Sequence, residues 1–221
     1  MFSSGYNIGA ARVAALAEAA DGPTAGAIAA LARQHRLAIL YGYPEHNPEG
    51  APFNAAQLID RDGQCRHNYR KTHLYGDLDR QQFSASDSPS ALFELNGWKL
   101  GILICFDVEF PEAVRSLALA GADLVLVPTA NMLPYEFVCD VLVPCRAYEN
   151  QVFLAYANFD GAEGELTYCG KSCVVAPDGQ VIARAGQPEE LLIADLEPER
   201  LALAREGFSY VHLRRPVLYR S

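Results

Sequence analysis

The chain has 221 residues, of which 50% are hydrophobic and 20% charged, and its formal net charge is −9 at pH 7. This length suffices for a large core, and no linker, charge block or internal repeat divides it, so we expect one domain over residues 1–221. The acidic balance argues against a nucleic-acid partner, and no apolar run approaches the roughly 20 residues of a membrane span.

In the first half of the chain, apolar residues recur at helical spacing over residues 10–20 and 22–36. A buried strand is expected at 37–43. Residues 53–60 and 65–71 predict a hairpin around Asp62-Gly63, and residues 91–95 and 98–105 predict a second hairpin around Asn96-Gly97.

In the second half, residues 111–121 predict a helix ending at Gly121, and residues 122–128 form a wholly apolar strand. A helix that is bent or broken at Pro144 is expected over 135–150. Four further strands are predicted at residues 151–158, 171–177, 181–185 and 191–196. This alternation of helices with paired strands predicts a layered α/β fold with a mixed sheet.

The N-terminal segment MFSSGYNIGAARVAALAEAA lacks the basic and apolar regions of a secretory signal, so we expect a cytoplasmic protein. Six cysteines lie far apart, and reduced thiols fit that compartment. Two pairs, Cys139/Cys145 and Cys169/Cys173, lack the two-residue spacing of a zinc knuckle and have no neighbouring histidine. We therefore expect no metal site and treat these cysteines as small buried side chains.

Cys105 stands where the predicted strand 98–104 stops and Pro111-Glu112 opens a helix. A turn at the carboxyl end of a strand projects its side chains into the crevice where open α/β sheets bind ligands. Such a turn also leaves backbone N–H groups free to face a developing oxyanion. Lys71 likewise ends a predicted strand, and Thr129–Asn131 follow another. The position of Cys105 alone does not distinguish a nucleophile from a buried space-filling thiol.

Taken together, these segments resemble the nitrilase superfamily, whose members are carbon–nitrogen hydrolases. The matching motifs are YRKTHL with Lys71, GILICFDVEFPE with Cys105, GADLVLVPTA, RAYENQ and GKSCVVAPDGQVIARA. The resemblance covers essentially the whole chain from Gly5, and the lysine and cysteine motifs are specific only in combination. It implies a four-layer α-β-β-α sandwich, a homodimer or higher homo-oligomer, and a Glu-Lys-Cys triad that uses no metal and no cofactor.

Carried onto this chain, the resemblance makes Cys105 the nucleophile and Lys71 the stabiliser of the tetrahedral intermediate. The N–H of Phe106 would be a second oxyanion donor. A nearby ammonium favours a thiolate and holds negative charge on oxygen.

Three further residues are candidates for supporting the substrate. Asp79 falls nearest the position of a further family glutamate, although a solvated loop aspartate is an equal alternative. Glu109 either borders the pocket or lies at the surface, and Asn131 lies on the loop that would form a pocket wall. His73 suggests a Cys-His thiol hydrolase, but the other motifs do not support that alternative.

The family's general base is a glutamate in a Pro-Glu pair before a Gly-Tyr. Here Gly5-Tyr6 supplies the Gly-Tyr, so we expect the pair just before Met1, and we expect the domain to lack its first strand. Losing a general base typically costs on the order of 10²–10⁴ in rate. Glu45 also follows a proline, but it ends a different strand and is expected at the surface.

True nitrilases of the superfamily tend to carry Trp-Glu after the cysteine, whereas this chain has Phe106-Asp107. The motif is therefore closer to amidases acting on small carboxamides, with a small-molecule amide as the substrate. An N-carbamoyl amino acid hydrolase, a nitrilase, an ω-amidase and a non-catalytic binding or assembly member of the fold remain alternatives. We favour an amidase over a carbamoylase because no arginine is evidently placed to hold a substrate carboxylate.

Overall fold

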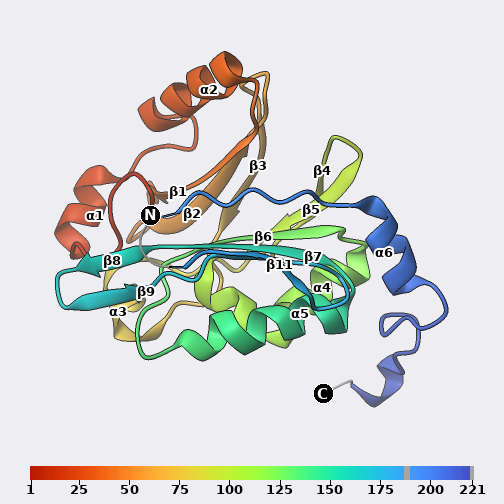
Figure 1. The fold of residues 1–221 in the computed structure, drawn as a ribbon. Coiled ribbons are helices and arrows are strands. Elements are labelled where there is room, and N and C mark those ends of the chain that lie inside the picture. Colours follow the sequence, from red (N-terminus) through yellow and green to blue (C-terminus); the bar gives the residue numbers. More distant parts are fainter. Residues whose placement is uncertain (187–189, 220–221) are drawn as a thin grey trace.

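The computed structural model describes residues 1–186 and 190–219, in which two β-sheets lie between outer layers of helices (Figure 1). The first sheet is antiparallel with strand order β1-β2-β3. The second is mixed, with order β11-β10-β7-β6-β5-β4. Helices α1 and α2 pack on the first sheet, and α5 packs on the second. The predicted four-layer α-β-β-α sandwich is confirmed.

The strands are β1 (Ile39–Glu45), β2 (Phe53–Ile59), β3 (Cys65–Arg70), β4 (Phe93–Leu95), β5 (Trp98–Ile102), β6 (Leu124–Thr129), β7 (Phe153–Asn158), β8 (Asp160–Glu163), β9 (Leu166–Cys169), β10 (Cys173–Val175) and β11 (Val181–Arg184). The helices are α1 (Ala10–Leu16), α2 (Pro23–His35), α3 (Gly76–Gln82), α4 (Pro111–Ala120), α5 (Val143–Asn150) and α6 (Pro198–Arg205). Short 3-10 helices cover Cys105–Glu109 and Pro216–Leu218, and a π-helical turn covers Val138–Leu142.

The local signals read from the sequence set most of these boundaries. Helix α4 begins at Pro111, whose missing N–H costs nothing in a first turn, and ends at Gly121 with φ 99°. Strands β2 and β3 form the predicted hairpin, as do β4 and β5. The helix expected over 135–150 is continuous from residue 136 to residue 150, and a π-helical turn over Val138–Leu142 runs directly into α5 before Pro144.

The strand predicted at residues 191–196 is wrong. Residues 190–197 are irregular, and the side chains of Leu191 and Ile193 are 85% and 83% exposed. Alternating apolar residues favour a strand only where a neighbouring strand accepts their hydrogen bonds, and this segment pairs with none among the described residues. The hairpin of β8 and β9 and the helices α3 and α6 were not predicted.

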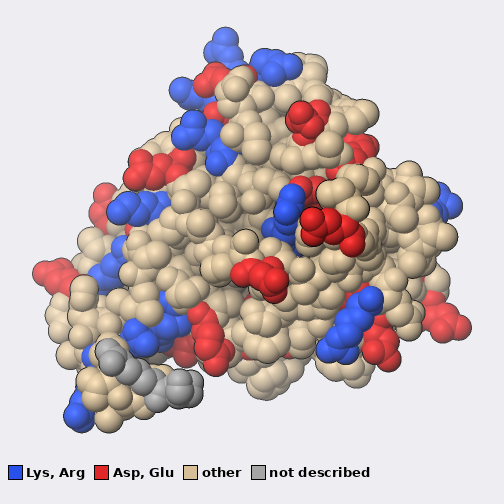
Figure 2. All heavy atoms as spheres, turned by 180° about the vertical axis from the view of Figure 1, so that it is seen from behind, with Lys and Arg blue, Asp and Glu red and all other residues tan. Residues whose placement is uncertain are grey.

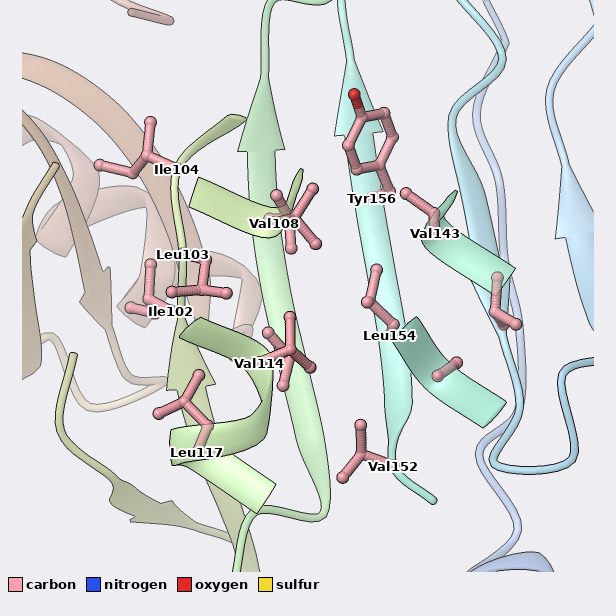
Figure 3. Packing of buried hydrophobic residues seen from close by; sticks show 14 of the residues in the cluster. Ile102, Leu103, Ile104, Val108, Val114, Leu117, Val143, Val152, Leu154 and Tyr156 are labelled. Carbon is pink, nitrogen blue, oxygen red and sulfur yellow. The ribbon is translucent and has the colours of Figure 1, made fainter. Parts of the chain in front are cut away.

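The main core lies between the second sheet and its helices (Figure 3). Ile102 ends β5 and Leu103 follows it in the core, Val114 and Leu117 come from α4, and Leu154 comes from β7. Strand β6 pairs in parallel with both β5 and β7, so the carboxyl ends of these three strands reach the same edge of the sheet. That edge carries the turn at Cys105.

Charges of both signs are scattered over the face shown in Figure 2, and most of that face is uncharged. Within residues 1–186 and 190–219, no helix is both long and apolar enough to cross a membrane.

Candidate active site

Cys105 begins the 3-10 helix that follows β5, and its backbone has φ 50°. This left-handed conformation is uncommon for a residue other than glycine and persists only where the surroundings impose it. The consequence is a sharp turn that presents the thiol beyond the strand end, and Cys105 is half-buried there.

The buried carboxylate of Asp107 holds that turn in place. Its Oδ2 accepts hydrogen bonds from the N–H of Ile104 at 3.0 Å and the hydroxyl of Tyr69 at 3.0 Å. Its Oδ1 accepts from the Thr72 hydroxyl at 3.0 Å and the His73 N–H at 2.9 Å. Asp107 therefore ties the Cys105 turn to the loop that follows β3.

Arg146 in α5 braces the same turn from the other side. Its Nε donates to the carbonyl of Val108 at 3.1 Å and its Nη2 to the carbonyl of Glu109 at 2.9 Å, while Nη1 contacts Glu149 at 2.9 Å. Sequence reasoning used RAYENQ only as a family motif and did not find this role. The available signal was an arginine about two helical turns before a predicted strand. The main-chain carbonyls that it binds lie 37 and 38 residues away, so their contact with it could not be predicted.

Lys71 follows β3 directly, and its side chain is 1% exposed. Its Nζ lies 2.5 Å from Oδ2 of Asp79, which is fully buried on α3. The Tyr6 hydroxyl donates to Oδ1 of Asp79 at 2.8 Å, and the Tyr75 N–H donates to Oδ2 at 2.8 Å. Asp79 is thus a buried partner of Lys71, and the alternative of a solvated loop aspartate is wrong.

Cys105 and Lys71 each affect the pKa of the other. Burial raises the pKa of the Cys105 thiol above its ordinary value, and Lys71 and a backbone hydrogen bond from Ala130 offset this rise only in part. Burial lowers the pKa of the Lys71 ammonium, but Cys105 and Asp79 raise it, and the net shift is upward. Lys71 therefore stays protonated and favours the thiolate, while the free enzyme still holds Cys105 mainly as a thiol.

The loop carrying Tyr6 is anchored by Glu163 at the end of β8. Its carboxylate accepts the N–H of Tyr6 at 3.0 Å and that of Asn7 at 2.6 Å, and it also accepts the hydroxyl of Tyr168. Sequence reasoning missed Glu163 because 157 residues separate it from Tyr6.

Two cavities adjoin Cys105. The smaller, of about 20 Å³, is also lined by Met1, Tyr6 and Asn54. The larger, of about 150 Å³, is lined by four aromatic rings, by Met132 and by a single carboxylate; these residues are Tyr6, Tyr75, Phe106, Tyr135, Met132 and Glu109. The larger cavity has room for a small organic group next to the thiol.

The other candidate site residues lie in different parts of the structure. Asn131 lines the larger cavity, but its Nδ2 donates to the carbonyl of Tyr135 at 3.0 Å, so it shapes the wall. His73 stacks on Phe110, with ring centroids 4.0 Å apart, and lines a separate cavity, so the structure gives no support to a Cys-His pair.

Glu45 is 3% exposed and paired with Arg70, which makes its predicted surface position wrong. Glu45 lies on the face of β1 that carries Tyr41 and Tyr43, under the helical layer, where Asn68 and Arg70 bind its carboxylate and compensate its charge.

Comparisons with known proteins identify the family. The family model described as carbon-nitrogen hydrolase matches residues 1–206. The chain belongs to the carbon–nitrogen hydrolases of the nitrilase superfamily. Amidases among its relatives agree with hydrolysis of amide carbon–nitrogen bonds as the general reaction of this hydrolase.

Individual relatives of this carbon–nitrogen hydrolase cover most of its length. It is 57% identical to a Pseudomonas protegens protein named "Hydrolase in pqqF 5'region", over 99% of the chain and 77% of the relative. It is 35% identical to an (R)-stereoselective amidase of a Pseudomonas species, over 98% of the chain and 78% of the relative. It superimposes on an amidase from Nesterenkonia sp. AN1 with a TM-score of 0.81 and 34% identity, covering 96% of this chain and 76% of that one. Another structure of that amidase records addition of acrylamide at its active-site cysteine.

Proposed function

We propose that this protein hydrolyses a small carboxamide to a carboxylate and ammonia through a thioester on Cys105. The observation that carries the proposal is the buried Lys71–Asp79 ion pair. Its ammonium offsets in part the rise that burial causes in the pKa of the Cys105 thiol. A lysine kept charged beside a thiol is suited to forming a thiolate and to stabilising a negatively charged oxygen.

In the proposed reaction, Sγ of Cys105 attacks the amide carbon and the carbonyl oxygen becomes an oxyanion. Lys71 and the N–H of Phe106 stabilise that oxyanion. Its collapse breaks the carbon–nitrogen bond, and the nitrogen leaves as ammonia after taking up the proton that the Cys105 thiol lost on attack. Water then attacks the thioester, which releases the carboxylate and restores the thiol. Asp79 orients Lys71 throughout, and Asn131 and Glu109 border the space for the acyl group.

The test is to measure ammonia release from a panel of small amides, N-carbamoyl amino acids and nitriles. Hydroxylamine is added in parallel, because it intercepts a thioester as a hydroxamate. We expect turnover of amides, hydroxamate formation, and loss of both in Cys105→Ala. The variant Cys145→Ala, which alters an exposed cysteine, is the matched control.

Other outcomes of the panel select the alternatives. Preferential turnover of N-carbamoyl amino acids or of nitriles would replace the amidase assignment. No turnover, together with alkylation of Cys105 no faster than that of Cys145, would favour a non-catalytic binding or assembly role.

The general base stays a prediction. Met1 lines the small cavity beside Cys105, so a glutamate placed directly before Met1 would enter the same region. Adding Pro-Glu before Met1 is expected to raise the rate of amide hydrolysis. Equal rates with and without this extension would contradict the prediction.

We also propose that the protein forms a homodimer or higher homo-oligomer. Large apolar side chains are exposed on the helical segment that the π-helical turn and α5 form: Phe137 (62%) just before the turn, Val141 (38%) in it and Tyr148 (49%) in α5. An exposed apolar patch of this kind typically marks an interface. Sedimentation of the protein and of a Phe137→Glu variant tests this, and a monomeric parent protein would contradict it.

A further inference from the structure

The larger cavity beside Cys105 combines aromatic rings with one negative charge. Tyr75 lies edge-on to Phe106, with ring centroids 5.4 Å apart, and edge-on to Tyr135, with centroids 6.2 Å apart. Of the described residues that line it, Glu109 is the only carboxylate, and none is lysine or arginine. Aromatic faces and a carboxylate are both attractive to a cation and offer nothing to an anion.

The Glu109 carboxylate has no hydrogen bond or ion pair with any described residue, although its side chain is only half-buried and borders the cavity. The neighbouring cation does not neutralise it, because Arg146 binds the main-chain carbonyl of Glu109 and the carboxylate of Glu149. Burial raises the pKa of the Glu109 carboxyl, and Lys71 and Arg146 lower it only in part. A half-buried carboxylate that has no ion-pair partner is stabilised in its charged form by a bound positive charge.

The ionisable groups beside the thiol are paired or uncharged. The Lys71 ammonium is paired with Asp79, and burial favours the neutral thiol of Cys105. Among the described residues that line the larger cavity, Glu109 is therefore the one charged group without an ion-pair partner. Arg146 also fixes the backbone at Glu109, so this carboxylate is held at the cavity by a braced turn.

We propose that the cavity selects amides whose acyl group carries a protonated amine, bound by Glu109 and by the rings of Tyr75, Phe106 and Tyr135. This inference rests on the proposed amidase function and names its substrate class. Amides whose acyl group carries a carboxylate are rejected, because they place a second negative charge beside Glu109 with no cation to pair it.

Three amides of similar size but different charge test the inference. They are β-alaninamide (cationic), butyramide (neutral and nearly isosteric with it) and succinamate (anionic). We expect kcat/KM to fall in that order, with at least about tenfold between the first two, as a charge-assisted contact provides. In Glu109→Gln the ratio of β-alaninamide to butyramide should fall about tenfold or more. Glu112→Gln, an exposed glutamate three residues on, should leave this ratio unchanged.

A second measurement reads the charge of the cavity without turnover. Cationic 2-(trimethylammonium)ethyl and anionic 2-sulfonatoethyl methanethiosulfonate are reacted with the protein, and labelling of the Cys105 and Cys145 peptides is followed by mass spectrometry. At Cys105 the cationic reagent should react faster by about tenfold or more relative to the same ratio at Cys145. Glu109→Gln should abolish that preference.

The outcomes separate this inference from the proposed function. Turnover of amides without a charge preference overturns the inference and leaves the amidase function standing. No turnover of any amide, with the reagent preference present and lost in Glu109→Gln, overturns the amidase function and supports the selectivity of the cavity for cations. An equal loss of activity toward all three amides in Glu109→Gln overturns the inference, because Glu109 would then act on the reaction itself.

Discussion

The ammonium of Lys71 lies 2.5 Å from Oδ2 of Asp79, and the two side chains are 1% and 0% exposed. An ion pair this deeply buried is stable only while both charges are present, because either charge alone would be buried without water and without an opposite charge. The same lysine acts on Cys105, so one contact connects the stability of the fold to the reactivity of the site.

Removing the lysine should destabilise the protein strongly. Lys71→Met leaves the Asp79 carboxylate buried against Tyr6 and Tyr75 without a cation, and we expect the free energy of unfolding to fall by about 3–5 kcal/mol. Urea unfolding followed through the fluorescence of Trp98, the one tryptophan of the chain, measures this. The exposed Lys99→Met is the control and should change stability by less than about 0.5 kcal/mol. A Lys71→Met protein as stable as its parent would contradict the buried pair.

Alkylation of Cys105 should depend on both pH and Lys71. Since the pKa of the thiol is raised by burial and lowered in part by Lys71, its rate with iodoacetamide should keep rising as pH passes 9. In Lys71→Met the opposing charge is gone, so the profile should move to higher pH. Peptide mass spectrometry at a series of pH values measures both profiles, and an unshifted profile would show that the two groups do not interact.

Stability should decline on the alkaline side. The pKa of Cys105 is higher in the folded state than its ordinary value of 9.0, and that of Lys71 is higher than 10.5. The folded protein therefore keeps protons that the unfolded chain loses as pH rises through these ordinary values. The contribution of Cys105 is present below pH 9.0 and that of Lys71 below pH 10.5, and each decreases as the pH rises above its value. Unfolding curves at pH 8, 9, 10 and 11 measure the trend, and constant stability across them would refute it.

Asp107→Asn should loosen the Cys105 turn. The amide that replaces one carboxylate oxygen would face donors from Ile104 and Tyr69 or from Thr72 and His73. Because bonds to a charged acceptor contribute about 1.5–3 kcal/mol each, we expect a loss of at least about 3 kcal/mol. Thermal and urea unfolding measure it, with the exposed Asp87→Asn as control. An equal effect of both variants would contradict the role assigned to Asp107.

Glu163→Gln should release the loop that carries Tyr6. The carboxylate accepts two backbone N–H groups and the Tyr168 hydroxyl, and an amide cannot satisfy all three. We expect faster hydrogen exchange at Tyr6 and Asn7 and a loss of about 2 kcal/mol in stability. The exposed Glu165→Gln should have neither effect. Unchanged exchange at Tyr6 in Glu163→Gln would show that other contacts hold the loop.

By itself the sequence determined many of the local elements and the placement of the two reactive side chains. Apolar periodicity, the Asp62-Gly63 and Asn96-Gly97 turns and the Pro111 and Gly121 boundaries act within a few residues, so they are readable without coordinates. Lys71 after β3 and Cys105 after β5 were both predicted at strand ends, where the structure places them.

Only the tertiary structure decided how far each charged side chain is buried and what it contacts. The partner of Asp79 at Tyr6 lies 73 residues away, that of Glu163 at Tyr6 lies 157 away, and Glu45 meets Arg70 across the first sheet. The apolar segment 191–196 has the pattern of a strand but no described strand beside it. Burial and pairing depend on which distant segments pack together, and a periodic pattern records only which side of each segment is apolar.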